Sequence, residues 1–154
     1  MKVLLATEGS EFSNAAIEKC CQMFAESANT EIRIISAVEP MIPPTEPFAV
    51  SADYVREIDD AARKQAGEVV SKAEAEIRRR FPTLAADLTT TVTTGSPEQA
   101  VVEEAERWGA DLIVTGSHGH GFWKRAWLGS VSNGIVHHAP CSVLVVRKNG
   151  SVKS

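Results

Sequence analysis

The sequence has few aromatic residues, only three cysteines, no excess of basic residues and no long apolar run. Aromatic residues make up 6% of the chain, so we expect a core built mainly from Val, Ile, Leu and Ala. Lys and Arg number 16 against 20 for Asp and Glu, a formal charge of −4, which argues against a nucleic-acid binder. The same acidity and the absence of a run of transmembrane length argue against a membrane protein.

The cysteines do not form a pattern typical of a disulfide framework or a zinc site. Cys20 and Cys21 are adjacent, and Cys141 lies far from them in the chain. Neither chemistry uses that spacing, so we expect buried and inert thiols. The apolar run at the N-terminus is four or five residues long, too short for a signal peptide. These features predict a cytoplasmic protein.

Short apolar strands alternate with amphipathic helices along the chain. The apolar and β-branched runs predict strands at 3–7, 31–38, 88–94, 111–116 and 142–148. The periodicity predicts four helices, one starting after Ser13 as its N-cap and the others over 51–80, 97–108 and 130–138. Ser96 precedes Pro97 as a second N-cap, and Gly109 ends that helix.

This order predicts an α/β fold, a parallel sheet with helices on both faces. We expect one domain over residues 1–148, followed by a polar tail over 149–154. Four prolines between 39 and 48 predict a long loop, which is either a lid or partner surface or a passive insertion.

Two strand ends carry residues suited to a ligand. The first strand ends in Thr7 and Glu8, and the fourth is followed by Gly116 and Gly119. These two glycines can adopt positive φ and let a ligand approach the backbone closely. A helix then starts at Gly129–Ser130, where free N–H groups attract an anion. The sequence thus predicts a phosphate cradle that is neither a dinucleotide fingerprint nor a P-loop.

The stretch "GSHGHGFWKRAWLGSVSNGIVHHAPCSVLVV" resembles the C-terminal signature of the universal stress protein family. The ATP-binding branch of that family carries G-x2-G-x9-G-[ST], which Gly116, Gly119, Gly129 and Ser130 match. "KVLLATEGSEFSNAA" and "GSPEQAVVEEAERWGADLIVTGSHG" extend the resemblance over nearly the whole chain.

The resemblance implies a single Rossmann-like domain of the adenine nucleotide alpha-hydrolase-like type. It implies a five-stranded parallel sheet of order 3-2-1-4-5 and a homodimer through the last strand, Ser142–Arg147. It also implies bound ATP with Mg²⁺ or Mn²⁺. The implied nucleotide-binding residues are, on the adenosine side, Ala6, Thr7, Glu8, Ala37 and Val38, and on the phosphate side Gly116, Ser117, Gly119, Gly129, Ser130, Val131 and Ser132, with Thr115 beside them.

The sequence favours a binding module over a fast enzyme, because no nucleophile with its base is evident. Glu8 stands where the family usually has Asp, and its longer side chain bears on affinity and nucleotide choice. Slow ATP hydrolysis assisted by Glu8 and a nucleotide-independent interaction dimer are the alternatives. His118 and His120 could form a metal pair, but the pattern favours loop surface with a possible phosphate contact.

Overall fold

The protein is described from a computed structural model, which places residues 1–40, 51–118 and 128–148. Gly119, His120, most of the proline-rich loop and the predicted tail lie outside these ranges. The elements in chain order are β1 (Lys2–Ala6), α1 (Glu11–Phe24), β2 (Glu31–Val38), α2 (Ala52–Arg80), β3 (Asp87–Thr94), α3 (Pro97–Trp108), β4 (Leu112–Gly116), α4 (Ser130–His138) and β5 (Ser142–Val146).

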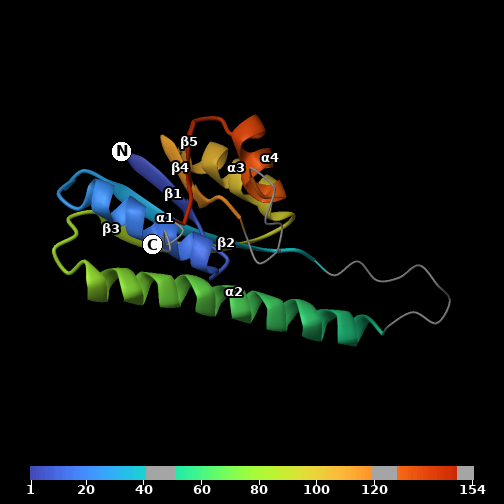
Figure 1. Ribbon diagram of the computed structural model, residues 1–154. Helices are drawn as coiled ribbons and strands as arrows, with labels where there is room; N and C mark the ends of the chain where they lie inside the picture. Colours follow the sequence, from blue (N-terminus) through green and yellow to red (C-terminus); the bar gives the residue numbers. More distant parts are fainter. Residues whose placement is uncertain (41–50, 119–127, 149–154) are drawn as a thin grey trace, which may run out of the picture.

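The five strands form one parallel sheet of order β3-β2-β1-β4-β5. Helices α1 and α2 lie on one face of this sheet, and α3 and α4 lie on the other (Figure 1). The structure thus confirms the α/β fold predicted from the alternating pattern and the strand order implied by the family resemblance.

Side chains that alternate along the central strands supply two cores. Leu5 points to the α1 and α2 side, where it packs with Cys20 and Val70. Its neighbour Leu4 points the other way and packs with Val101 of α3. Both leucines are fully buried, which explains why β1 is apolar at consecutive positions.

The threonines of β3 follow the same alternation. Leu88 and Val92 pack against the core beneath α2. Thr89, Thr91 and Thr93 are side by side with Arg33, Ile35 and Ala37 of β2 and therefore point to the opposite face. A strand with one apolar face can thus be rich in threonine.

Helix α1 begins earlier than the sequence predicts, so the assignment of Ser13 as its N-cap is wrong. Ser10 is the N-cap, and its Oγ accepts a hydrogen bond from Ser13 N at 3.2 Å. Gly9 adopts φ +82°, which reverses the chain at once after β1 and brings the helix start forward. The predicted signals of α3 are confirmed, because Ser96 caps it and Gly109 ends it with φ 69°.

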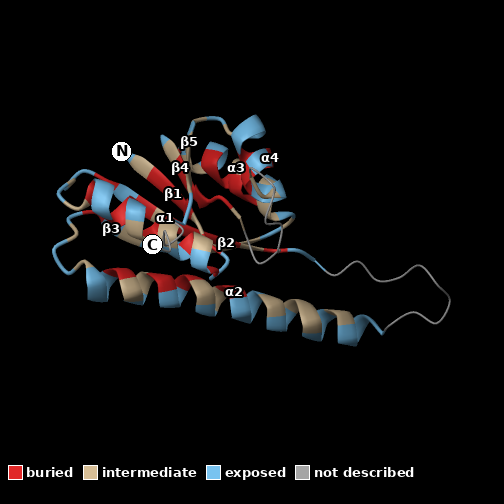
Figure 2. Ribbon diagram, in the orientation of Figure 1, coloured by how far each residue is buried: buried red, intermediate tan, exposed pale blue. Residues whose placement is uncertain are grey.

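Only the second half of α2 packs against the sheet. Its buried residues are Ala66, Val70, Ala73 and Ile77. The first half extends past the end of the sheet, and its exposed and half-buried residues are visible in Figure 2.

Candidate functional site

The predicted ligand residues that the structure describes lie at the carboxyl ends of β1, β2 and β4 and at the start of α4. These strands are neighbours, and the chain passes from β1 outward to β2 and β3 on one side, then from β4 to β5 on the other. The strand order therefore reverses between β1 and β4, where open α/β sheets bind their ligands.

The turn from β1 to α1 is held by a chain of hydroxyl groups. The buried Thr7 donates its backbone N–H to Ile35 O at 2.9 Å and its Oγ1 hydrogen to Ser13 Oγ at 3.1 Å. Ser13 Oγ donates in turn to Ser10 O at 3.0 Å, and Gly9 N donates to Thr7 Oγ1 at 3.2 Å. This network fixes the backbone on both sides of the exposed Glu8.

Ser117 connects the end of β4 to the start of α4 through hydrogen bonds. Its carbonyl oxygen accepts hydrogen bonds from Gly129 N at 2.7 Å and from Ser132 Oγ at 3.0 Å. Its backbone N–H donates to Val146 O of β5 at 2.8 Å. Ser117 and Gly129, on either side of 119–127, are therefore held together, and Ser117 is also bonded to the edge strand β5.

His118, the residue after Ser117, contacts α1. Its Nδ1 lies 3.1 Å from Ser117 Oγ, and its ring lies against Phe12 with the ring centroids 5.3 Å apart. Phe12, Ser10 and Ser13 support the site from the first turn of α1, a role that sequence reasoning missed. The signal available was their position directly after a strand end that carries Thr7 and Glu8.

The start of α4 has no side-chain cap. Ser10, Ser51 and Ser96 cap α1, α2 and α3, but the N-cap of α4 is Gly129 and it makes no side-chain hydrogen bond. The N–H groups of residues 130–132 precede the first intrahelical hydrogen bond, which Asn133 N makes to Gly129 O at 2.9 Å. Such a helix start favours an anion through its N–H groups and its dipole.

Gly116 has a packing role that the sequence did not reveal. Among the described glycines, positive φ occurs at Gly9, Gly95 and Gly109, so Gly116 does not use the conformational freedom that a glycine has. A Cβ added to Gly116 would lie 2.7 Å from the carbonyl carbon of Phe12. The glycine therefore permits close packing of β4 against α1.

The structure brings the remaining predicted residues to the same edge of the sheet. Ala6 and Ala37, on β1 and β2, are half-buried. Val38 and Thr115, at the ends of β2 and β4, are buried, as is Ser132. Ser130 and Val131 are exposed at the start of α4.

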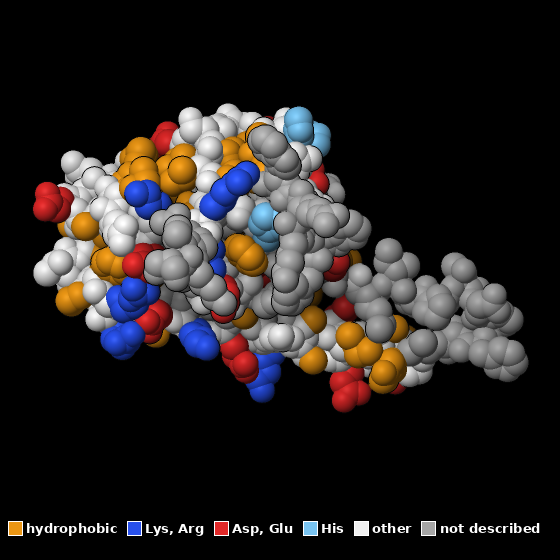
Figure 3. Space-filling model, in the orientation of Figure 1, with side chains coloured by type: hydrophobic (Ala, Val, Ile, Leu, Met, Phe, Trp, Pro, Cys, Tyr) orange, Lys and Arg blue, Asp and Glu red, His pale blue; other side chains and the backbone are white. Residues whose placement is uncertain are grey.

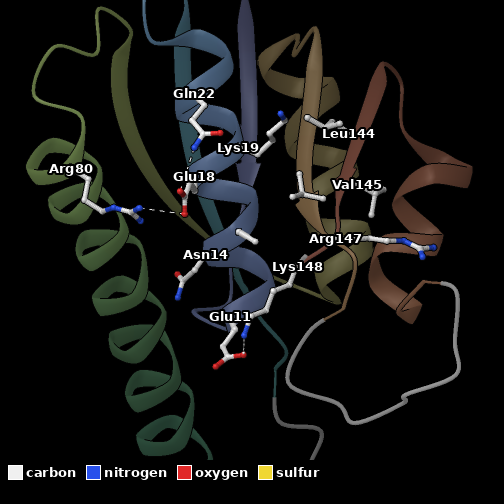
Figure 4. Close-up of a pocket in the computed structure, with 12 residues that line it drawn as sticks. Glu11, Asn14, Glu18, Lys19, Gln22, Arg80, Leu144, Val145, Arg147 and Lys148 are labelled. Atoms are coloured by element: carbon white, nitrogen blue, oxygen red, sulfur yellow. Dashed lines mark hydrogen bonds and ion pairs between the residues drawn. The ribbon is translucent and has the colours of Figure 1, made fainter. Parts of the chain in front are cut away.

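A separate groove of about 870 Å³ lies between α1 and β5. Lys19 and Gln22 of α1 and Leu144 of β5 line it, and the Lys148–Glu11 ion pair lies at one end (Figure 4). Cationic and anionic side chains are interspersed on the face shown in Figure 3.

Within the described ranges, no three His, Cys, Asp or Glu side chains are grouped to hold a metal ion. No helix in these ranges is long and apolar enough to cross a membrane.

Comparison with known proteins gives consistent results. A relative from Coxiella burnetii, universal stress protein A homolog 2, is 29% identical over 153 residues, and the alignment covers 97% of this chain and 97% of the relative. The solved structure of UspA from Lactobacillus plantarum matches with a TM-score of 0.77 at 23% identity, over 96% of this chain and 97% of the other. A universal stress protein solved in complex with cAMP matches with a TM-score of 0.65 at 25% identity, over 95% of this chain and 96% of the other.

The description of the family that matches is "Universal stress protein family", and the match spans residues 1–147. It includes every strand and helix of the structure. The chain belongs to the universal stress protein family.

Proposed function

We propose that the protein binds an adenine nucleotide and that this nucleotide is ATP. Its phosphates would lie at the start of α4. The observation that carries the proposal is the uncapped helix start at Gly129, held beside β4 by the bond from Gly129 N to Ser117 O at 2.7 Å. The related universal stress protein in complex with cAMP supports the choice of an adenine nucleotide.

The described residues suggest a role for each part of the site. The hydroxyl of Ser130 and the N–H groups of Val131 and Ser132 would donate to phosphate oxygens. The nucleoside would lie toward β1 and β2, where Ala6 and Ala37 leave the sheet partly open. Glu8 would contact the ribose or a Mg²⁺ or Mn²⁺ ion bound to the phosphates, since such ions take few carboxylates and several phosphate or water oxygens.

Substituting Gly129 tests the phosphate position. In Gly129→Asp, the new carboxylate is well placed to accept hydrogen bonds from the first turn of α4, as Asp does at many N-caps. It would occupy the anion position with a charge of the same sign as phosphate. We expect ATP affinity to fall about 100-fold, the equivalent of one or two charge-assisted hydrogen bonds.

Gly129→Ala is the matched control. It adds the same Cβ, 3.3 Å from His118 Cα and Ser117 O, without the carboxylate. Isothermal titration calorimetry with Mg-ATP should show near wild-type affinity for Gly129→Ala and a large loss for Gly129→Asp. Equal affinity for ATP in Gly129→Asp and wild type would refute the site, and no binding of adenine nucleotides by the wild type would refute the function.

We further propose a homodimer through the last strand, residues Ser142–Arg147. β5 is an edge strand with Val143 to Val146 half-buried. An edge of this kind tends to pair with another strand unless charge or a covering element blocks it.

A further inference from the structure

Thr93, near the end of β3, has a hydroxyl group without a partner. Its Oγ1 is buried and makes no hydrogen bond, whereas the residue as a whole is half-buried. Native proteins rarely retain such a group, because a buried polar atom without a partner loses its hydrogen bonds to water and gains none in return. A valine would have the same shape as Thr93 and would avoid this loss. The fold therefore does not require the hydroxyl.

The strand register places Thr93 at the level of the candidate site. Thr93 lies beside Ala37 of β2, and Gly95 N donates to Val38 O at 2.9 Å just beyond, which holds the two strand ends together. Ala6 lies beside Ile35, and Thr7 N donates to Ile35 O at 2.9 Å, so the chain leaves β1 toward Glu8 next to this part of β2. Thr93 is thus in register with one predicted nucleotide contact, Ala37, and lies on the edge of the sheet where β1 leads to another, Glu8.

Thr93 also lies on the face of the sheet that carries the two small residues of the site. Ala6 packs with the cluster on the α3 side, and alternation places Ala37 on that side together with its neighbour Thr93. The side chains of Ala6 and Ala37 end at Cβ and are half-buried. Across the sheet from β1 to β3, away from α4, Thr93 carries the first side-chain hydroxyl that follows these two alanines on this face.

The distance from the phosphate position suits the far end of a nucleotide. β3 is three strand positions from β4, about 14 Å at the usual spacing between strands. Phosphates at the start of α4 would therefore leave the base of an extended nucleotide near the ends of β2 and β3.

We propose that the hydroxyl of Thr93 is a hydrogen-bonding contact for the base of the bound adenine nucleotide. This inference rests on the proposed function. Rotation of χ1 by one staggered step moves Oγ1 to the position that Cγ2 now occupies and Cγ2 to that of the Cβ hydrogen, so the hydroxyl can turn toward a bound base. The ligand then supplies the partner that the protein lacks, so part of the binding free energy comes from removal of an unfavourable state.

Thr93→Val separates this role from a structural one, because the two roles predict opposite changes. Loss of an unpaired hydroxyl should raise the urea midpoint of the ligand-free protein and weaken Mg-ATP binding about 5- to 20-fold. Thr93→Ser keeps the hydroxyl and should retain affinity within about twofold. Thr91→Val makes the same change two residues earlier on the same face and should leave affinity unchanged.

Calorimetry of the wild type and the three variants measures their affinity for Mg-ATP, and urea denaturation measures their stability without ligand. Wild-type affinity in Thr93→Val overturns the inference but leaves the proposed function in place. Lower stability of ligand-free Thr93→Val overturns it as well, because the hydroxyl would then have a structural partner. If the wild type binds neither ATP nor cAMP, the proposed function itself fails.

Discussion

Gly116 of β4 lies directly against the backbone of Phe12 in α1. A Cβ on the glycine would lie 2.7 Å from the Phe12 carbonyl carbon and 2.8 Å from its oxygen. These are backbone atoms in the first turn of a helix, so they cannot move aside as a flexible side chain would. The absence of a side chain at Gly116 sets how closely α1 approaches the site.

Gly116→Ala should therefore destabilise the fold. We expect a loss of about 1–3 kcal/mol in the free energy of unfolding, the usual cost of overpacking. Gly67→Ala is the matched control, because Gly67 lies inside α2 and a Cβ there meets nothing within 4 Å. It should stabilise by about 0.5–1 kcal/mol, the helix preference of Ala over Gly. Urea denaturation measures both, and similar effects of the two substitutions would contradict the packing argument.

The buried Glu104 depends on one of its two arginine partners more than on the other. Arg33 Nη1 lies 2.7 Å from Glu104 Oε1, and the Arg33 guanidinium also lies 4.2 Å from the centre of the Trp108 ring. Arg107 also pairs with Glu104, but its side chain is 70% exposed. We expect Arg33→Ala to destabilise by about 2–4 kcal/mol and Arg107→Ala by less than about 1. Thermal unfolding should show this difference, and equal losses would contradict it.

Cys20 and Cys21 make stability sensitive to alkaline pH. Burial raises the pKa of Cys20 to about 12, with a contribution from Cys21. Burial raises the pKa of Cys21 to about 11, partly offset by Arg80. The unfolded chain releases these protons near pH 9, whereas the folded chain retains them. Stability is therefore unaffected by these thiols below about pH 8.5 and falls above it, by about 1.4 kcal/mol per pH unit for each thiol.

Urea denaturation between pH 8 and 10.5 measures this slope. The double variant Cys20→Ala, Cys21→Ala should start from lower stability, because Ala leaves cavities, but lose stability less steeply as pH rises. Identical slopes in both proteins would show that the thiols do not contribute.

A charge on β5 should prevent the proposed dimer. Val145 is half-buried, and it belongs to neither of the two core clusters, in contrast to Leu144. Val145→Lys places a cation on the edge strand, which disfavours pairing of edges. Sedimentation equilibrium should show a dimeric wild type and a monomeric variant with the same circular dichroism. A monomeric wild type would refute the interface.

The fold was predictable because strong local signals agree along the chain. The apolar runs of β1 and β4 and the Ser96–Pro97 and Gly109 signals of α3 each specify one element, and the alternation specifies a parallel sheet. The helix start at Ser10 was missed because Ser13 is also a good N-cap residue. The choice between them depends on the turn at Gly9, which φ +82° makes tight.

The placement of the candidate site residues at the strand ends was predictable, but their contacts within the protein were not. Register aligns the strands β1, β2 and β4 that lead to Glu8, Ala37 and Ser117, and family resemblance had named all three. The reason for glycine at Gly116 could not be read from spacing, because it depends on a helix approaching from elsewhere in the sequence. The unpaired hydroxyl of Thr93 is likewise a tertiary property. Cytoplasmic location stays a prediction from composition.

The uneven packing of α2 has a consequence for local stability. Its buried residues begin at Ala66, so the preceding turns gain little from the sheet. Opening of those turns exposes few apolar contacts and should require only a fraction of the global free energy of unfolding. Amide hydrogens before Ala66 should thus exchange with deuterium long before those near Val70 and Ile77. One continuous helix would then contain two units of different lifetime, with the boundary set by where the sheet ends.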